Sequence, residues 1–146
     1  MSEKQNIGFA LRAIKTIEFA TVTDSFTEDG AINIESNFEF SLHGELPVVF
    51  VRFNCYYKCN NNLFLVLKCE CSFEIVIQSF EKFKINNNLI RLPKLLLTHL
   101  GVLTVGTARG ILHSKVENSK FSFLLLPTVN VTEMIKEDME FHRVEN

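Results

Sequence analysis

Residues 63–77 constrain the fold more than any other part of the chain. Apolar side chains occupy every odd position there for eight alternations. An extended strand places residues i and i+2 on one side, whereas a helix would spread them around its surface. The segment therefore predicts a long antiparallel strand with one buried face, made of Leu63, Leu65, Leu67, Cys69, Cys71, Phe73, Ile75 and Ile77.

Two preceding segments show the same period of two. In residues 32–42 the apolar positions are Ile32, Ile34, Phe38, Phe40 and Leu42, and in residues 49–59 they are Val49, Val51, Phe53, Cys55, Tyr57 and Cys59. Breaks at 43–47 and 59–62 separate the three strands, and a weaker run at 14–20 suggests an edge strand. Because the turns are short and polar, we expect an antiparallel meander.

The second half of the chain has a helical texture. Pro93 lies at an expected first turn, Leu96, Leu100 and Leu103 form one stripe, and Gly110 is the expected end. A short second helix should follow residues 127–130, with Asn130 and Glu133 as a capping box and an apolar side of Val131, Met134, Ile135 and Met139. The predicted fold class is α+β, a four-stranded antiparallel sheet followed by two helices on one face.

Composition limits the number of domains, the partners and the cellular location that we expect for this chain. A chain of 146 residues with 47% hydrophobic content suits a single domain over 1–146, and we expect 1–13 and 141–146 to be flexible tails. The net charge of −2 does not provide the excess of positive charge that binding to nucleic acid or an anionic bilayer requires. The polar start does not resemble a signal peptide, and residues 89–112 look too polar for a lipid-facing span, so we expect a cytoplasmic protein without membrane insertion.

The residues that carry chemistry in other proteins form no motif here. We therefore expect no catalytic residue, no metal ligand and no cofactor, and hence not an enzyme. The four cysteines, two in each of two strands, are interpreted as buried small hydrophobes, because zinc knuckles need a turn at each pair. The four histidines fall in a turn, a helix, a loop and the tail. Arg109, near the expected helix end, is interpreted as a stabilising cap.

The second face of the strands and one helix stripe suggest surfaces for contact. Apolar residues lie opposite the core face, so something should cover them at least part of the time. They are Val48, Phe50, Tyr56, Phe64, Val66 and Val76. A stripe of small residues on the long helix fits either a subunit contact or packing on its own sheet, and comprises Gly101, Thr104, Val105 and Ala108.

The order of these segments resembles the SecB export-chaperone family from about Ile14 to Glu140. Residues 14–19 resemble the first SecB strand, and the three alternating strands follow in the same order. The helix that starts after Leu92-Pro93 and reaches Thr107-Ala108-Arg109-Gly110 is similar to the aromatic-Pro start and Ser-Arg-Gly finish of the family. Residues 126–130, Leu-Pro-Thr-Val-Asn, are similar to the Pro-Val-Asn element before its last helix.

The resemblance implies a function and an assembly. It implies a dimer of dimers, a homotetramer with the long helices inside, whose groove holds unfolded polypeptide without ATP. Client contacts are then expected at Val48, Phe50, Tyr56, Phe64, Val66, Val76 and Met139, and a subunit interface at Gly101, Thr104, Val105 and Ala108. Partners would be unfolded clients and either the SecA motor or an antitoxin. The short, mildly acidic C-terminus and the few candidate acidic residues, Glu70 and Glu74, fit SecA docking poorly.

Two other classes of function remain open at this point. A curved antiparallel sheet closed by a helix is able to form a cup for a small apolar ligand or an enzyme substrate, but such a pocket needs a few converging polar groups. A module that binds one folded partner would select a native surface, whereas a holding chaperone prefers unfolded chains of unrelated sequence.

Overall fold

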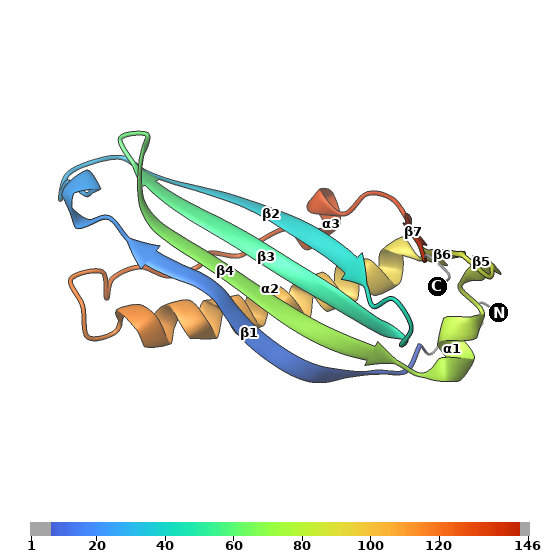
Figure 1. The fold of residues 1–146 in the computed structure, drawn as a ribbon. Coiled ribbons are helices and arrows are strands. Elements are labelled where there is room, and N and C mark those ends of the chain that lie inside the picture. Colours follow the sequence, from blue (N-terminus) through green and yellow to red (C-terminus); the bar gives the residue numbers. More distant parts are fainter. Residues whose placement is uncertain (1–6, 144–146) are drawn as a thin grey trace.

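The computed structural model describes residues 7–143, arranged as one long sheet with a helix lying across one face (Figure 1). The strands are β1 (Phe9–Thr21), β2 (Ile32–Leu42), β3 (Val48–Cys59) and β4 (Asn62–Ile75). A short 3-10 turn, η1 (Thr23–Ser25), follows β1. The predicted strands at 32–42, 49–59 and 63–77 are confirmed to within two residues, since β4 ends at Ile75.

The sheet order is β1-β4-β3-β2, with every neighbouring pair antiparallel. The meander therefore holds for β2, β3 and β4, whose turns are short. In the β3–β4 turn, Asn60 and Asn61 both have positive φ, 50° and 68°, as a two-residue type I′ hairpin requires. The longer stretch between β1 and β2 lets β1 cross to the far side of β4, so β1 is an edge strand as predicted.

The expected N-terminal tail is wrong in part. β1 begins at Phe9, and Phe9 packs edge-to-face on Phe73 of β4 with ring centroids 6.0 Å apart. Residues 1–6 lie outside the described part of the chain.

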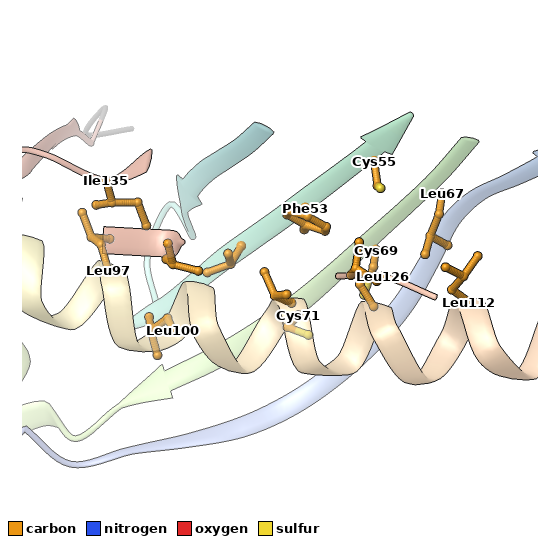
Figure 2. Packing of buried hydrophobic residues seen from close by; sticks show 14 of the residues in the cluster. Phe53, Cys55, Leu67, Cys69, Cys71, Leu97, Leu100, Leu112, Leu126 and Ile135 are labelled. Atoms are coloured by element: carbon orange, nitrogen blue, oxygen red, sulfur yellow. The ribbon is translucent and has the colours of Figure 1, made fainter. Parts of the chain in front are cut away.

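Helix α2 (Lys94–Val116) supplies the second layer. Its inner side chains, such as Leu97, Leu100 and Leu112, belong to one hydrophobic core with those of β3 and β4, such as Phe53, Cys69 and Cys71 (Figure 2). By length and composition alone α2 would pass as a membrane-crossing helix, contrary to the expectation from 89–112. In this fold it is instead the core helix of a two-layer structure.

Helix α2 runs six residues beyond the predicted end at Gly110. Leu112 and Val116 are almost fully buried, and burying two such side chains contributes roughly 3 kcal/mol or more. One glycine inside a helix costs only about 1 kcal/mol, so the helix continues through it. His113, expected on a loop, consequently lies on α2.

The remaining elements are short. They are α1 (Ile77–Glu81), β5 (Lys84–Asn86), β6 (Leu89–Leu92), α3 (Val131–Met134) and β7 (Met139–His142). Strands β5, β6 and β7 form a second small sheet, and β7 pairs with β6 from Leu89–His142 to Leu92–Met139. The expected tail at 141–146 is thus wrong for Phe141 and His142, while 144–146 are outside the described residues. Met139, predicted on the second helix, is a strand residue.

Candidate binding groove beside strand β2

The segment after α2 is bound to the helix and sheet through three consecutive carbonyl groups. The Tyr57 hydroxyl donates to the carbonyl of Leu125 at 2.9 Å. Arg109 donates from Nε to the carbonyl of Leu126 and from Nη2 to that of Pro127, both at 3.0 Å. Arg109 is therefore not a helix cap, because α2 continues past it and its guanidinium holds the next segment.

The same segment then turns through α3 and ends in β7. Asn130 Oδ1 accepts a hydrogen bond from the Glu133 backbone N–H at 3.3 Å, which confirms half of the predicted capping box. Asp138 Oδ1 accepts one from the Lys94 N–H at 2.7 Å, so a distant carboxylate caps the first turn of α2. The segment 124–139 is thereby attached at both ends.

Between this segment and β2 the surface is hollowed. Two cavities of about 640 and 650 Å³ adjoin there and share Ser36, Met134 and Lys136; we call them together the edge groove. One wall is β2, through Ile34, Ser36, Asn37, Phe38 and Phe40. The other is made of Leu126, Pro127, Thr128, Val129, Asn130, Glu133, Met134, Ile135, Lys136, Glu137, Asp138 and Met139.

The groove exists because the helix layer is centred on β3 and β4. The core-face side chains of β3 and β4 are almost all buried, but those of β2, such as Ile34, Phe38 and Phe40, are only partly buried. Gly101 on α2 lets α3 approach closely, since a Cβ there would lie 2.9 Å from Val131 Cγ1 and 3.2 Å from Ile135 Cδ1. The space beyond this contact is the groove.

A third cavity, of about 550 Å³, lies among aromatic rings near η1. It is lined by Phe26, Glu28, Lys120 and Phe123. The Phe26 ring contacts that of the half-exposed Phe123 in a tilted arrangement with centroids 5.8 Å apart, and Lys120 Nζ lies 5.7 Å from the Phe26 ring centroid. Residues 121–125 connect this aromatic cavity directly to the wall of the edge groove.

The client contacts predicted from the sequence do not converge on one site. Val48, Phe50, Tyr56 and Val66 lie on the sheet face away from α2, Val76 is exposed at the start of α1, and Met139 lines the edge groove. Groove residues such as Ile34, Phe38 and Met134 were assigned to the core instead. Only the position of the helix layer could have revealed them.

Phe64 is a correction, because it does not lie on that second face. Tyr57 pairs with Leu65 and Lys58 with Leu63, which leaves Phe64 as the extra residue of a β-bulge. Its ring is fully buried against Phe26 and Phe121, at 5.1 and 5.4 Å. The bulge reverses the alternation that the sequence pattern assumed.

The expected cover on the outer face stays a prediction, because Val48, Phe50 and Tyr56 are only partly buried there. Val66 is only 7% exposed there without a second layer, and Lys68 Nζ lies 6.0 Å from the centroid of the adjacent Tyr56 ring. Long charged side chains cover apolar surface with their stems in this way.

The small-residue stripe of α2 faces inward. Gly101, Thr104, Val105 and Ala108 are all buried within one chain, and Thr104 and Val105 are 0% and 4% exposed. The predicted subunit contact through this stripe is therefore replaced by the alternative, packing on its own chain. The outward positions Leu95, Val102 and Leu103 are 74%, 52% and 41% exposed.

All four cysteines are buried with free thiols, as predicted for small hydrophobes. Burial raises the pKa of the Cys55 thiol to about 12. A hydrogen bond between Cys69 and Cys71 raises the pKa of the Cys69 thiol and lowers that of the Cys71 thiol. Within residues 7–143, no group of three His, Cys, Asp or Glu side chains is arranged to hold a metal ion.

Comparison with known proteins gives matches among solved structures and none by sequence. No family model matches the chain, and no curated protein matches it by sequence. Among solved structures it is similar to the SecB-like chaperone Rv1957 of Mycobacterium tuberculosis, in complex with a ChAD peptide from the HigA1 antitoxin. The TM-score is 0.52 and the identity 11%, over 83% of this chain and 90% of that one. The chain thus has an α+β fold like that of a SecB-like chaperone.

Proposed function

We propose that this protein is an ATP-independent holding chaperone that binds extended segments of unfolded polypeptide in the edge groove. The observation that carries the proposal is a hollow lined by apolar and polar side chains beside an edge strand, on a fold shared with a chaperone that binds a peptide. Partly buried aromatic and Met side chains suit such variable contacts, since Met adapts to many shapes. No bond in the client needs to be made or broken.

The small-ligand cup has less support. It requires space between the sheet and the helix, and that space is filled by side chains such as Phe53, Cys71 and Leu100, all of them 0% exposed. Arg52 and Glu70, candidates for converging polar groups, pair with each other at 2.8 Å on the outer face.

As the partner we propose an antitoxin-type client in preference to the SecA motor. We also propose that the two proteins meet in the cytoplasm. The similar chaperone of known structure binds an antitoxin peptide. Glu70 and Glu74, which would give a docking surface its acidity, are paired with Arg52 and Arg12. The outer face of β3 and β4 consequently offers little unpaired negative charge.

We also propose that the chain forms a homotetramer through its uncovered apolar surface. Leu95, Val102 and Leu103 project outward from α2, and Leu11 and Ile14 of β1 are 45% and 51% exposed. Burying such side chains between subunits removes apolar area that a soluble monomer rarely exposes in one patch.

The test is suppression of aggregation of chemically unfolded proteins, followed by light scattering without ATP at equimolar ratio. We expect suppression by the wild type and its loss in Met134→Glu, which puts a charge into the groove. Val76→Glu, at a position 46% exposed and outside the groove, is the matched control. If only the Val76 variant loses the suppression of aggregation, the client site lies on the surface predicted from the sequence. If the wild type does not suppress aggregation, the chaperone function is refuted.

A further inference from the structure

The turn between β2 and β3 is closed by a histidine side chain. His43 Nδ1 accepts two hydrogen bonds, from the backbone N–H of Glu45 at 3.1 Å and from that of Leu46 at 3.0 Å. Within residues 7–143, neither N–H group has another acceptor. Asn and Asp close turns in a similar way with a side-chain oxygen. Here an imidazole nitrogen takes the place of that oxygen.

This arrangement requires a neutral imidazole. A neutral ring carries one proton, which must lie on Nε2 because Nδ1 needs its lone pair to accept. A second proton would add to Nδ1 itself, and the ring would then present an N–H to the two backbone N–H groups. The closed turn and a protonated His43 therefore exclude each other.

The last described residue of the chain binds the same turn. Arg143 follows β7, and its Nη1 and Nη2 donate to the carbonyls of Glu45 and Leu46 at 3.3 and 2.6 Å. Its Cζ also lies 4.9 Å from the ring centroid of Phe80 in α1. The turn, α1 and β7 lie at one end of the molecule (Figure 1). Arg143 thus joins the β2–β3 hairpin to the small sheet.

One peptide group couples the two side chains. The peptide between Glu45 and Leu46 donates its N–H to His43 and accepts from Arg143 with its C=O. The N–H and C=O of a trans peptide point in opposite directions, so His43 and Arg143 hold this group from its two sides. A rotation that takes the N–H away from His43 also turns the carbonyl away from Arg143.

The other charged and titratable side chains around the turn come from the turn itself, α1, β4 and β7. They are Glu45, Glu81, which acts on Arg143, Glu74, which lies opposite Val48 and is paired with Arg12, and His142, next to Arg143. Only His142 is, like His43, of the residue type that ordinarily gains a proton between pH 5 and 8. Experiment has to separate the effects of these two histidines.

We infer that the 43–47 turn is a proton-operated latch: uptake of one proton by His43 opens the turn and releases Arg143, and with it the end of β7, from the β2–β3 hairpin. The latch is closed above about pH 6.5, where a free imidazole is neutral, and opens as the pH falls. Because one proton is bound, the ratio of open to closed turns rises at most about tenfold per pH unit. Opening uncovers the ring of Phe80, which is 1% exposed in the closed state. The latch does not depend on the proposed function.

The first experiment is hydrogen exchange measured by mass spectrometry at pH 7.5 and 5.5, corrected for the intrinsic exchange rate at each pH. In the wild type, protection of the amides of 44–46 should be about tenfold lower at pH 5.5. In His43→Asn, Oδ1 replaces Nδ1 as an acceptor that does not titrate, so protection should be independent of pH, whatever its level. His142→Gln should behave like the wild type. Equal protection of the wild type at both pH values, or the same loss in His43→Asn, would overturn the latch.

The second experiment tests the link to β7. Arg143→Met keeps an apolar side chain over Phe80 but has no donor for the turn carbonyls. Residues 139–143 of the wild type should exchange faster at pH 5.5 than at pH 7.5, and those of Arg143→Met should exchange as fast at both. The turn amides of this variant should keep their dependence on pH. If the wild-type turn opens in acid while 139–143 exchange equally at both pH values, His43 does not control β7 and the inference is wrong.

Discussion

Two glycines of α2 differ in how closely other side chains approach them. A Cβ on Gly101 would lie 2.9 Å from Val131 Cγ1, whereas nothing is within 4 Å of a Cβ on Gly110. The glycine at 101 therefore allows close packing, and the glycine at 110 only costs helix stability.

We predict that Gly101→Val lowers the free energy of unfolding by roughly 1–3 kcal/mol, because its side chain overpacks the contact with α3. Gly110→Ala should raise it by about 0.5–1 kcal/mol through helix propensity. Urea unfolding followed by circular dichroism measures both. Equal shifts of the same sign would contradict the packing of α3 on α2.

A second prediction at this scale concerns alkaline pH. Burial raises the pKa of the Cys55 thiol from 9.0 to about 12, and also raises that of the Tyr57 hydroxyl. The unfolded chain ionises the thiol from about pH 9 while the folded chain keeps the proton. The contribution of this thiol to stability is thus complete below pH 9 and falls toward pH 12, by up to about 1.4 kcal/mol per unit.

Urea unfolding at pH 8, 9, 10 and 11 should show this decline. Cys55→Ala should be less stable at pH 8 but should lose less stability between pH 9 and 11, because one of the buried groups with a raised pKa is gone. An identical pH dependence in the variant would mean that Cys55 ionises in the folded protein as readily as in the unfolded chain.

At the scale of elements, the segment before α3 depends on two side chains for its position. Tyr57 and Arg109 bind the carbonyls of residues 125, 126 and 127 in succession. The planar guanidinium reaches two neighbouring carbonyls at once, which an ammonium group cannot reproduce. Residues on β3 and α2 therefore hold this part of the groove wall through hydrogen bonds.

Arg109→Lys should loosen this wall with a loss of about 1 kcal/mol in local stability. Hydrogen exchange measured by mass spectrometry should be faster in residues 124–135 and unchanged in β3 and β4, and peptide binding should weaken. Arg12→Lys, at an exposed pair with Glu74, is the control and should leave both unchanged. Unaltered exchange in Arg109→Lys would show that the wall is held by packing alone.

At the scale of the whole molecule, the two layers have different surfaces. The outer face of the sheet carries paired charges, whereas the outward side of α2 carries exposed apolar side chains. Val102→Glu on the outward side of α2 should lower the mass measured by light scattering without unfolding the chain, because it buries a charge between subunits. Lys115→Glu on the same helix should not. A wild-type monomer at all concentrations would refute the tetramer.

Alternation along the chain was enough to predict β2, β3 and β4, the turn at 59–62 and the burial of the four cysteines. These features are local, because a period of two decides which side chains share a face before any other element is placed. The same reasoning failed at Phe64, where a bulge adds one residue and reverses the faces.

Tertiary structure decided the features that make the site. The place of β1 beside β4, the extension of α2 to Val116 and the strands β5–β7 depend on contacts between segments distant in sequence. The edge groove depends on them most: Ile34, Phe38 and Phe40 have the pattern of core residues, and they line a groove only because α2 lies over β3 and β4. A sequence pattern shows which face is apolar, whereas packing decides how much of that face the helix covers.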